Sequence, residues 1–239
     1  MTAPAPTSAT ERRRVRVHAA VLGLLAEQGF GVSMEAVASR AGCSKQTLYA
    51  QFGSKQELMR SVMGEHLDLA TARLDPDTQD PRTTLLAFAE QHLAHLCDPN
   101  VVAASRLLSN EARQFPEQAR TLYEDTCDSL MRRLAAWLQR AMDQGRLRHD
   151  DPHYAAELLL SMMVGLDFDR QRFGAPHRAR PQERRRWAEF AVDGFLRAFS
   201  PVASGAHAHT AAQATVPGRR IRATSPLPKT SKNRNGASP

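Results

Sequence analysis

The sequence predicts an all-α protein in which an N-terminal three-helix domain with a helix-turn-helix precedes a C-terminal helical bundle, about nine helices in total. Three observations support this prediction. No stretch shows the apolar and polar alternation of a half-buried strand. Residues 33–58 encode two short capped helices joined by a tight turn. Beyond residue 80, Pro and Gly punctuation separates five helical stretches, at residues 81–97, 101–114, 117–143, 152–172 and 181–199.

The 239-residue chain carries a formal net charge of +7, and this charge is unevenly distributed. Residues 1–60 contain 8 Lys and Arg against 4 Asp and Glu, residues 61–200 contain 18 against 21, and residues 201–239 contain 6 against 0. The basic ends and the slightly acidic middle predict that the N-terminal domain binds a polyanion while the central part has another role.

The first nine residues are rich in Pro, Ala, Ser and Thr, and we expect them to be disordered. A helix follows from Thr10 to the glycine at position 29, and its predicted buried stripe consists of Val15, Ala19, Leu22 and Ala26. Four arginines crowd its start, at positions 12, 13, 14 and 16. They either reach phosphates or form an ordinary solvated face.

The helix-turn-helix is marked by its caps. Ser33 can cap the first helix, Gly42 can end it in the left-handed conformation, and Ser44 can cap the second helix. The second helix has one apolar anchor pair, Leu48 and Phe52, at spacing i, i+4. The rest of its circumference presents hydrogen-bonding groups that suit base edges and phosphates, from Lys45, Gln46, Thr47, Tyr49 and Gln51.

A third helix begins directly after the second. Ser54 and Glu57 form a capping box, and Lys55 in the first turn lies where free N–H groups and the macrodipole favour an anion. A DNA phosphate is the expected anion. The helix is predicted to run to Leu74, where an Asp-Pro-Asp sequence ends it.

These residues resemble the DNA-binding domain of the TetR/AcrR transcriptional regulators, over residues 11–60. The resemblance is carried by AEQGF at residues 26–30 and AGCSKQTLYAQFGSK at residues 41–55. It implies base contacts from Lys45, Gln46 and Gln51. It also implies phosphate contacts from Ser33, Ser44, Thr47, Tyr49 and Lys55. A departure is Cys43, where the family more often has valine.

Residues 106–117, RLLSNEARQFPE, resemble the AefR-like ligand-binding domains of the same family. Four domain ranges are therefore expected: a disordered N-terminus (1–9), a DNA-binding domain (10–60), a ligand-binding and dimerisation domain (61–200) and a disordered basic tail (201–239). The tail either tethers DNA or only solvates the chain. The implied function is that of a cytoplasmic homodimeric repressor that binds a palindromic double-stranded operator and is released by a small apolar effector.

Two helices near the C-terminal end are apolar around much of their circumference, which is typical either of helices wrapped by a domain or of an interface with another copy. The resemblance favours a dimer interface, with Leu158, Leu159, Met162, Leu166, Trp187, Phe190 and Phe195 as candidates. A ligand pocket could be lined by Phe88, Phe115, Tyr123, Met131, Trp137, Met162 and Phe168, although each suits plain core equally well. Glu111, Arg113 and Asp167 suit either a polar ligand group or surface ion pairs.

Three cysteines, Cys43, Cys97 and Cys127, give neither a disulfide framework nor a zinc spacing. His92 and His95 lie at i, i+3 near Cys97, but no further ligand completes a metal site, so no metal or cofactor is expected. An alternative function is a cysteine-based redox-sensing regulator without an organic ligand. An enzyme is not expected, because the sequence lacks nucleophile elbow, P-loop, dinucleotide and HExxH motifs. No apolar run approaches the length of a membrane span.

Overall fold

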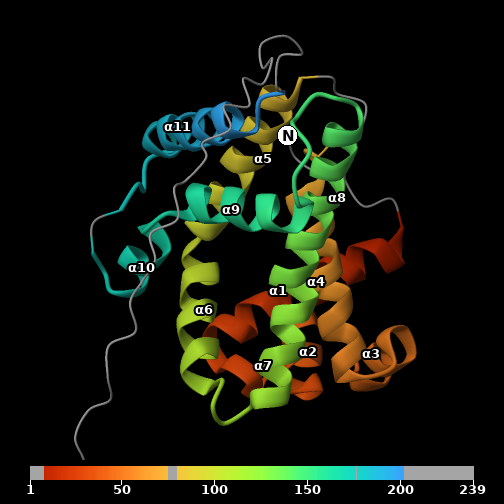
Figure 1. Cartoon of the computed structure of the whole chain (residues 1–239). Helices are drawn as coiled ribbons and strands as arrows, with labels where there is room; N and C mark the ends of the chain where they lie inside the picture. The colour runs from red at the N-terminus through yellow and green to blue at the C-terminus, as the bar shows by residue number, and fades with distance from the viewer. Residues whose placement is uncertain (1–7, 75–79, 176, 202–239) are drawn as a thin grey trace, which may run out of the picture. The chain divides into compact units, whose positions relative to one another are not determined.

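The computed structural model describes residues 8–74, 80–175 and 177–201, which contain eleven α-helices, a 3-10 turn and a π turn but no strand (Figure 1). The predicted all-α class is confirmed. The N-terminal elements are α1 (Ala9–Gln28), η1 (Gly29–Gly31), α2 (Met34–Ala41), α3 (Lys45–Phe52) and α4 (Lys55–Thr71). The later elements are α5 (Pro81–Leu96), α6 (Pro99–Glu111), α7 (Pro116–Tyr123), η2 (Glu124–Asp128), α8 (Ser129–Asp143), α9 (Pro152–Val164), α10 (Asp167–Arg172) and α11 (Pro181–Phe199).

The helix-turn-helix forms through the predicted caps. The side chains of Ser33, Ser44 and Ser54 accept hydrogen bonds from the third backbone N–H of α2, α3 and α4, at 3.1, 3.0 and 3.1 Å. Gly42 ends α2 with a φ of 65°, which a glycine adopts without a Cβ penalty. These local bonds set the turn between α2 and α3.

The first three helices and the first half of α4 enclose one apolar cluster, which we call the head core. Its members are Val17, Ala20, Val21, Leu24, Leu25, Val32, Met34, Val37, Ala38, Ala41, Leu48, Leu58, Val62 and Met63. The predicted stripe of α1 was wrong, because Val15 and Leu22 are 45% and 39% exposed. The buried face of α1 consists instead of Val17, His18, Ala20, Val21, Leu24 and Leu25.

The second cluster, the body core, is formed mainly by α5, α8, α9 and α11. Its largest fully buried members include Phe88, Leu134, Trp137, Leu138, Leu159 and Phe195. Figure 1 shows α11 crossing α5 and α9 crossing α8, and both pairs of helices pack together. The body core contains no residue of α6 or α7.

The described residues contain more helices than the nine expected, because two predicted long helices are divided. Gly165, with a φ of 55°, separates α9 from α10. A π turn, Glu124–Asp128, interrupts the predicted helix 117–143. α4 ends at Thr71, three residues before the predicted end near Leu74.

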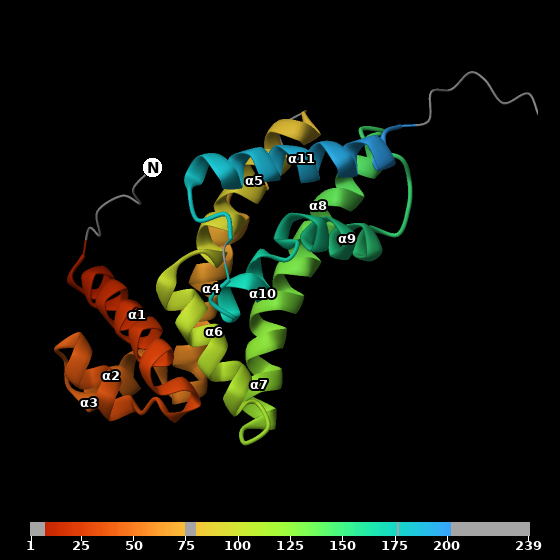
Figure 2. The same ribbon diagram turned by 90° about the vertical axis from the view of Figure 1, so that its left-hand side faces the viewer.

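α6 and α7 have no fully buried residue. Their apolar side chains Ala104, Leu108 and Leu122 pack against the head core instead of the body core. Figure 2 shows α6 lying against α1, and these two helices are among the most extensively contacting pairs. The helices that the sequence groups with the body therefore also brace the head.

Two predicted terminal segments fall largely outside the described residues. α1 begins at Ala9 with Ser8 as its N-cap, so residues 8 and 9 are ordered, contrary to the predicted range 1–9. Residues 1–7 and 202–239 lie outside the described part of the chain. In the part that is described, none of the helices combines the length and apolar character needed to cross a bilayer.

Candidate nucleic-acid interface

α3 presents most of its circumference to solvent. Leu48 is its one fully buried residue and fixes the helix to the head core. Lys45, Gln46 and Tyr49 are exposed, and Tyr49 has 46% of its surface accessible. Phe52 is half-buried and also packs against the head core, as the predicted anchor pair requires. A short helix with so few apolar contacts, and with amine, amide and phenol groups outside, is suited to contact a partner rather than to build a core.

The hydroxyl groups predicted for phosphate contacts are already part of the caps. Ser44 Oγ lies 2.7 Å from Thr47 Oγ1 and also accepts from the Thr47 N–H. Ser33 is exposed and accepts from the N–H of Ala36. Both serines therefore lie at helix N-termini, where free N–H groups favour an anion.

Lys55 has an intramolecular partner that the sequence did not predict. Its Nζ donates to the carbonyl oxygen of Phe30 at 3.0 Å. Partial burial of the ammonium lowers the pKa of Lys55. The lysine side chain thus links the start of α4 to η1, the turn that follows α1.

An open groove runs between the start of α1 and α3, lined by Thr10, Arg13, Gln46, Thr47, Ala50 and Gln51. Gln51 is half-buried, and its Oε1 has no hydrogen-bond partner among the described residues. The sequence predicted a possible phosphate contact for Arg13, as part of the arginine-rich start of α1, but none for Thr10. The groove places one guanidinium beside the recognition helix.

The four arginines at the start of α1 have different environments. Arg14 pairs with Glu11 at 2.8 Å, and Arg16 donates to the carbonyl of Ala41 at 3.2 Å. Arg12 is exposed, and Arg13 lines the groove. Only part of the basic run is therefore directed toward α3.

The seven candidate pocket residues are not brought together. Phe88 and Trp137 are fully buried in the body core, and Met131 and Met162 pack on its edge. Tyr123 is 57% exposed, and Phe115 contacts the Phe30 ring with centroids 5.9 Å apart. Phe168 lines a cavity of about 10 Å³, which has room for roughly one water.

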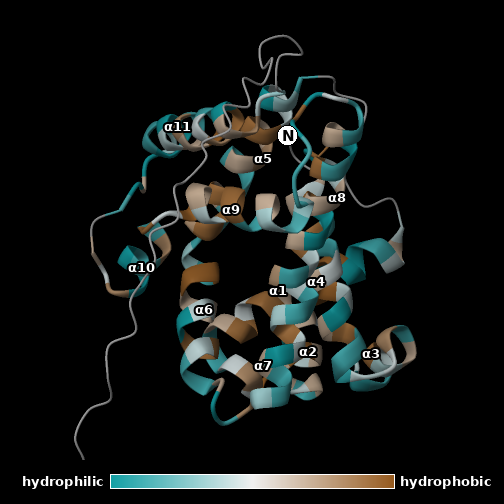
Figure 3. Ribbon diagram, in the orientation of Figure 1, coloured by the Kyte–Doolittle hydropathy of each residue, from teal (hydrophilic) through white to brown (hydrophobic). Residues whose placement is uncertain are grey.

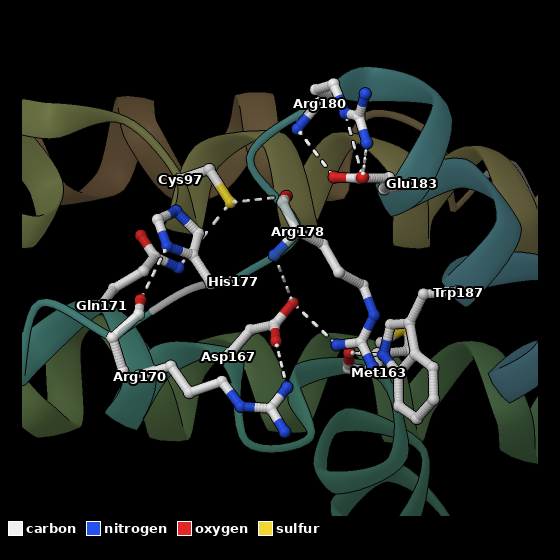
Figure 4. Close-up of polar contacts among 11 residues, drawn as sticks. Cys97, Met163, Asp167, Arg170, Gln171, His177, Arg178, Arg180, Glu183 and Trp187 are labelled. Carbon is white, nitrogen blue, oxygen red and sulfur yellow. Dashed lines mark hydrogen bonds and ion pairs between the residues drawn. The ribbon is translucent and has the colours of Figure 1, made fainter.

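Figure 4 shows the polar network beside that cavity. Asp167 is buried and pairs with Arg178 at 2.7 Å and with Arg170 at 3.0 Å. The Arg178 guanidinium lies 3.9 Å from the centroid of the Trp187 ring, whose Nε1 donates to the carbonyl of Met163. Burial alone would raise the pKa of Asp167, but the hydrogen bond and charge of Arg178 lower it overall. The network joins α9, α10 and α11, and it makes Asp167 an internal ion-pair partner.

The candidate dimer residues divide into two groups. Leu158, Leu166 and Phe190 are 45%, 63% and 65% exposed. Leu159 and Phe195 are fully buried in the body core, and Met162 and Trp187 are half-buried. Because α9 and α11 bury one face within the protomer, Leu159 and Phe195 have no surface to offer a partner. Figure 3 shows that α9 remains largely apolar.

A histidine contact joins α4 to α5. His66 Nε2 lies 2.8 Å from His95 Nε2, so one ring donates and the other accepts. Burial lowers the pKa of His66, and burial together with the neighbouring histidines lowers the pKa of His95 to about 4. Among the described residues, no group of three His, Cys, Asp or Glu side chains is arranged to hold a metal ion.

The redox hypothesis finds no support. Cys43 is half-buried against the head core, and Cys127 is exposed. Burial raises the pKa of the Cys97 thiol, which disfavours the reactive thiolate.

A helix-turn-helix whose second helix exposes most of its polar surface, beside a groove that contains Arg13, is typical of a DNA-binding transcriptional regulator. The family models agree: residues 19–62 match "Bacterial regulatory proteins, tetR family", and residues 83–201 match "AefR-like transcriptional repressor, C-terminal domain". The chain belongs to the TetR family of transcriptional regulators.

Several solved structures share the fold. The flavonoid-responsive regulator FrrA is 33% identical with a TM-score of 0.61, and the match covers 80% of this chain and 99% of FrrA. A TetR-family regulator from Mesorhizobium loti is 25% identical with a TM-score of 0.64, covering 81% and 99%. A third, from Pseudomonas syringae pv. tomato, is 27% identical with a TM-score of 0.57, covering 80% and 98%. No curated protein matches the sequence.

Proposed function

We propose that the protein is a homodimeric repressor that binds a palindromic operator and releases it when a small aromatic effector enters its helical body. The observation that carries the proposal is the exposed face of α3, which is held to the head core by the buried Leu48 and the half-buried Phe52. Residues 10–60 serve as the DNA-binding domain, and residues 61–200 serve as the ligand-binding and dimerisation domain.

On the DNA, α3 enters the major groove. Lys45, Gln46 and Gln51 face base edges, because amine and amide groups can read their donor and acceptor pattern. Ser33, Ser44, Thr47, Tyr49 and Lys55 contact phosphates. Lys55 Nζ either leaves the Phe30 carbonyl oxygen to contact a phosphate or donates to the carbonyl oxygen and the phosphate at the same time. Arg13 adds a phosphate contact from the groove beside α3.

Dimerisation uses α9 and α11. Leu158, Leu166 and Phe190 supply exposed apolar surface, which is costly to leave in water on a monomer. Leu159, Met162, Trp187 and Phe195 support this surface from within or at its edge. A two-fold dimer explains how a short recognition helix reaches operator specificity, because two half-sites are read together.

The effector is a planar aromatic molecule. The name of FrrA, a flavonoid-responsive relative at 33% identity, supports this class. In this chain the proposed binding region lies among α4, α6, α7 and α8, because α6 and α7 have no fully buried residue and contribute none to the body core. The effector prefers a body conformation that holds the two α3 helices at the wrong spacing, so its binding shifts the population away from the operator-competent state.

The DNA part of the proposal is tested with the DNA that flanks the gene. Wild-type protein should bind it more tightly than random DNA, with a steep loss of affinity as salt increases. Gln46→Ala should reduce the difference in binding free energy between the preferred base and other bases by about 1–3 kcal/mol. Tyr49→Phe should weaken binding to all operator variants alike. Equal losses on every operator variant for Gln46→Ala would remove it from base readout. Fluorescence anisotropy on a set of single-base operator variants provides the measurement.

The effector part is tested by adding a flavone, which is a planar aromatic compound, to the operator complex. We expect release of DNA together with a change in tryptophan fluorescence, because Trp137 and Trp187 both lie in the body. The same compound as a bulky glycoside is the matched control. Operator binding that is insensitive to every aromatic compound tried, with no fluorescence change, would contradict the proposed effector class.

A further inference from the structure

Glu111 makes a contact that neither of its sequence-based interpretations predicted. It is the last residue of α6, and its Oε2 accepts the backbone N–H of Phe30 at 2.8 Å, across 81 positions of the chain. It therefore serves neither as a ligand group nor as a surface ion pair. Its carboxylate is bonded to the turn that follows α1.

The turn is shaped to receive that carboxylate. Gly29 has a φ of 56°, and a Cβ added there would lie 2.1 Å from Glu111 Oε2. A side chain at position 29 would therefore be disfavoured both by backbone conformation and by the carboxylate. Gly29 and Glu111 therefore fit each other, although Gly29 belongs to the N-terminal family match (19–62) and Glu111 to the C-terminal one (83–201).

Phe30 is held from three directions. Glu111 bonds its N–H, Lys55 Nζ bonds its carbonyl oxygen at 3.0 Å, and the Phe115 ring lies against its ring. Glu111 and Phe115 come from the end of α6 and the turn after it. Lys55 is the first residue of α4 and lies three positions beyond the end of α3. Phe30 thus joins α6 to the chain segment that leaves the recognition helix.

The position of Glu111 opposes the helix dipole. A carboxylate in the last turn of a helix faces the negative end of the macrodipole, so the electrostatics of α6 alone disfavour it there. The charge-assisted hydrogen bond to the Phe30 N–H offsets this cost. The side chains of Leu108 on α6 and Leu122 on α7 add apolar contact with the head core.

We propose that Glu111 is a positioning residue for DNA binding, which fixes the head, and with it α3, to α6 through the backbone of Phe30. A movement of α6 thereby reaches the head through Phe30, and it reaches the start of α4, directly after the recognition helix α3, through the bond between Phe30 and Lys55. The DNA consequence rests on the proposed function, whereas the contact itself does not.

The test compares Glu111→Ala, which removes the acceptor, with Glu111→Gln, which keeps one at nearly the same reach. Glu117→Ala is the matched control, because Glu117 is an exposed glutamate near the start of α7. Two readouts are taken on the full chain: amide hydrogen exchange of a peptide that contains Phe30, and affinity for the flanking operator DNA. Tryptophan fluorescence reports whether the body remains folded.

We expect Glu111→Ala to speed exchange at Phe30 and to weaken operator binding, each by about tenfold, with the tryptophan signal unchanged. Glu111→Gln and Glu117→Ala should remain within about twofold of the wild type in both readouts. The proposal is overturned if Glu111→Ala matches the wild type, or if Glu111→Gln loses as much as Glu111→Ala. Wild-type protein that fails to prefer operator over random DNA would refute the proposed function, and the exchange readout would then decide the contact by itself.

Discussion

The two apolar cores of this protein differ in how many residues their helices bury. In the body core, α8 buries six residues, including Leu134, Trp137 and Leu138. In the head core, α3 buries only Leu48. The body helices are therefore fixed by packing on several sides, whereas the recognition helix keeps nearly all of its polar surface available. The difference shows which helix the fold has left free for a partner.

α6 and α7 fall between these two cases. They belong in sequence to the segment matched by the C-terminal family model, yet their apolar contacts join the head core. They bury no residue fully. By sequence α6 and α7 belong to the body, whereas by packing they belong to the head.

The largest expected effect is that of Leu48→Ala. Removing the single buried anchor of α3 should destabilise the head by about 3 kcal/mol, since a large buried aliphatic side chain is replaced by a cavity. Hydrogen exchange should accelerate in α2 and α3, while tryptophan-detected unfolding of the body remains unchanged. Ala50→Ser, at an exposed position of α3, is the control. An equal fall in the tryptophan-detected stability would mean that head and body unfold as one unit.

The second prediction concerns pH and the body core. Burial lowers the pKa of His92 from 6.5 to about 4, so the unfolded chain takes up the proton first. Stability is therefore fully present above pH 6.5 and decreases as the pH falls toward 4, by about 2–3 kcal/mol for this residue. Denaturant unfolding at several pH values provides the measurement. His92→Leu should flatten this dependence without abolishing it, because the pKa of His95 is lowered in the same way.

A wild-type stability that does not change between pH 7.5 and pH 5 would contradict this account of His92. The buried Nδ1 of His92 has no hydrogen-bond partner among the described residues. For that reason the leucine variant should lose little stability at pH 7.5.

The third prediction sharpens the junction between head and body. Gly29→Ala should destabilise the head by about 2 kcal/mol, because its backbone conformation is nearly restricted to glycine. The same substitution should cost less in a Glu111→Ala background, where the carboxylate no longer crowds the new Cβ. A double-mutant cycle on urea unfolding measures this coupling. Strict additivity would argue against direct contact between the two positions.

The smallest expected effect is that of the α3 cap. Ser44→Ala should destabilise the head by about 1 kcal/mol, since Ser44 Oγ accepts the Thr47 N–H. Ser44→Gly should destabilise the head by only a few tenths of a kcal/mol, because glycine is itself a tolerated cap. Exchange rates at the start of α3 distinguish the two variants. A loss for glycine as large as that for alanine would assign the effect to the hydroxyl's other contacts.

Local signals predicted the head well. The serine caps at positions 33, 44 and 54 and the glycine at position 42 act through neighbours within four residues, so the sequence alone locates them. The stripe of α1 failed because its start is polar and its burial is set by α2 and α6, which periodicity within one helix does not reveal. The exposure of Lys45, Gln46 and Tyr49 followed from the scarcity of apolar residues in α3.

Contacts between residues far apart in the chain were harder to predict from the sequence. The bond between Glu111 and Phe30 spans 81 positions, and the signals for it were a glycine after α1 and a glutamate at the wrong end of a helix dipole. Leu159 and Phe195 illustrate another limit, since apolar periodicity does not distinguish a core face from an interface face. The division of helix 152–172 at Gly165 depended on a positive φ that an isolated glycine does not reveal.

The most direct test of this account is hydrogen exchange of the full chain with and without the DNA that flanks its gene. We predict new protection in residues 44–53 and at the start of α1, with α8 unchanged. This result would identify α3 and the groove beside it as the DNA-binding surface. Protection confined to the body, or none at α3 despite bound DNA, would contradict the central claim.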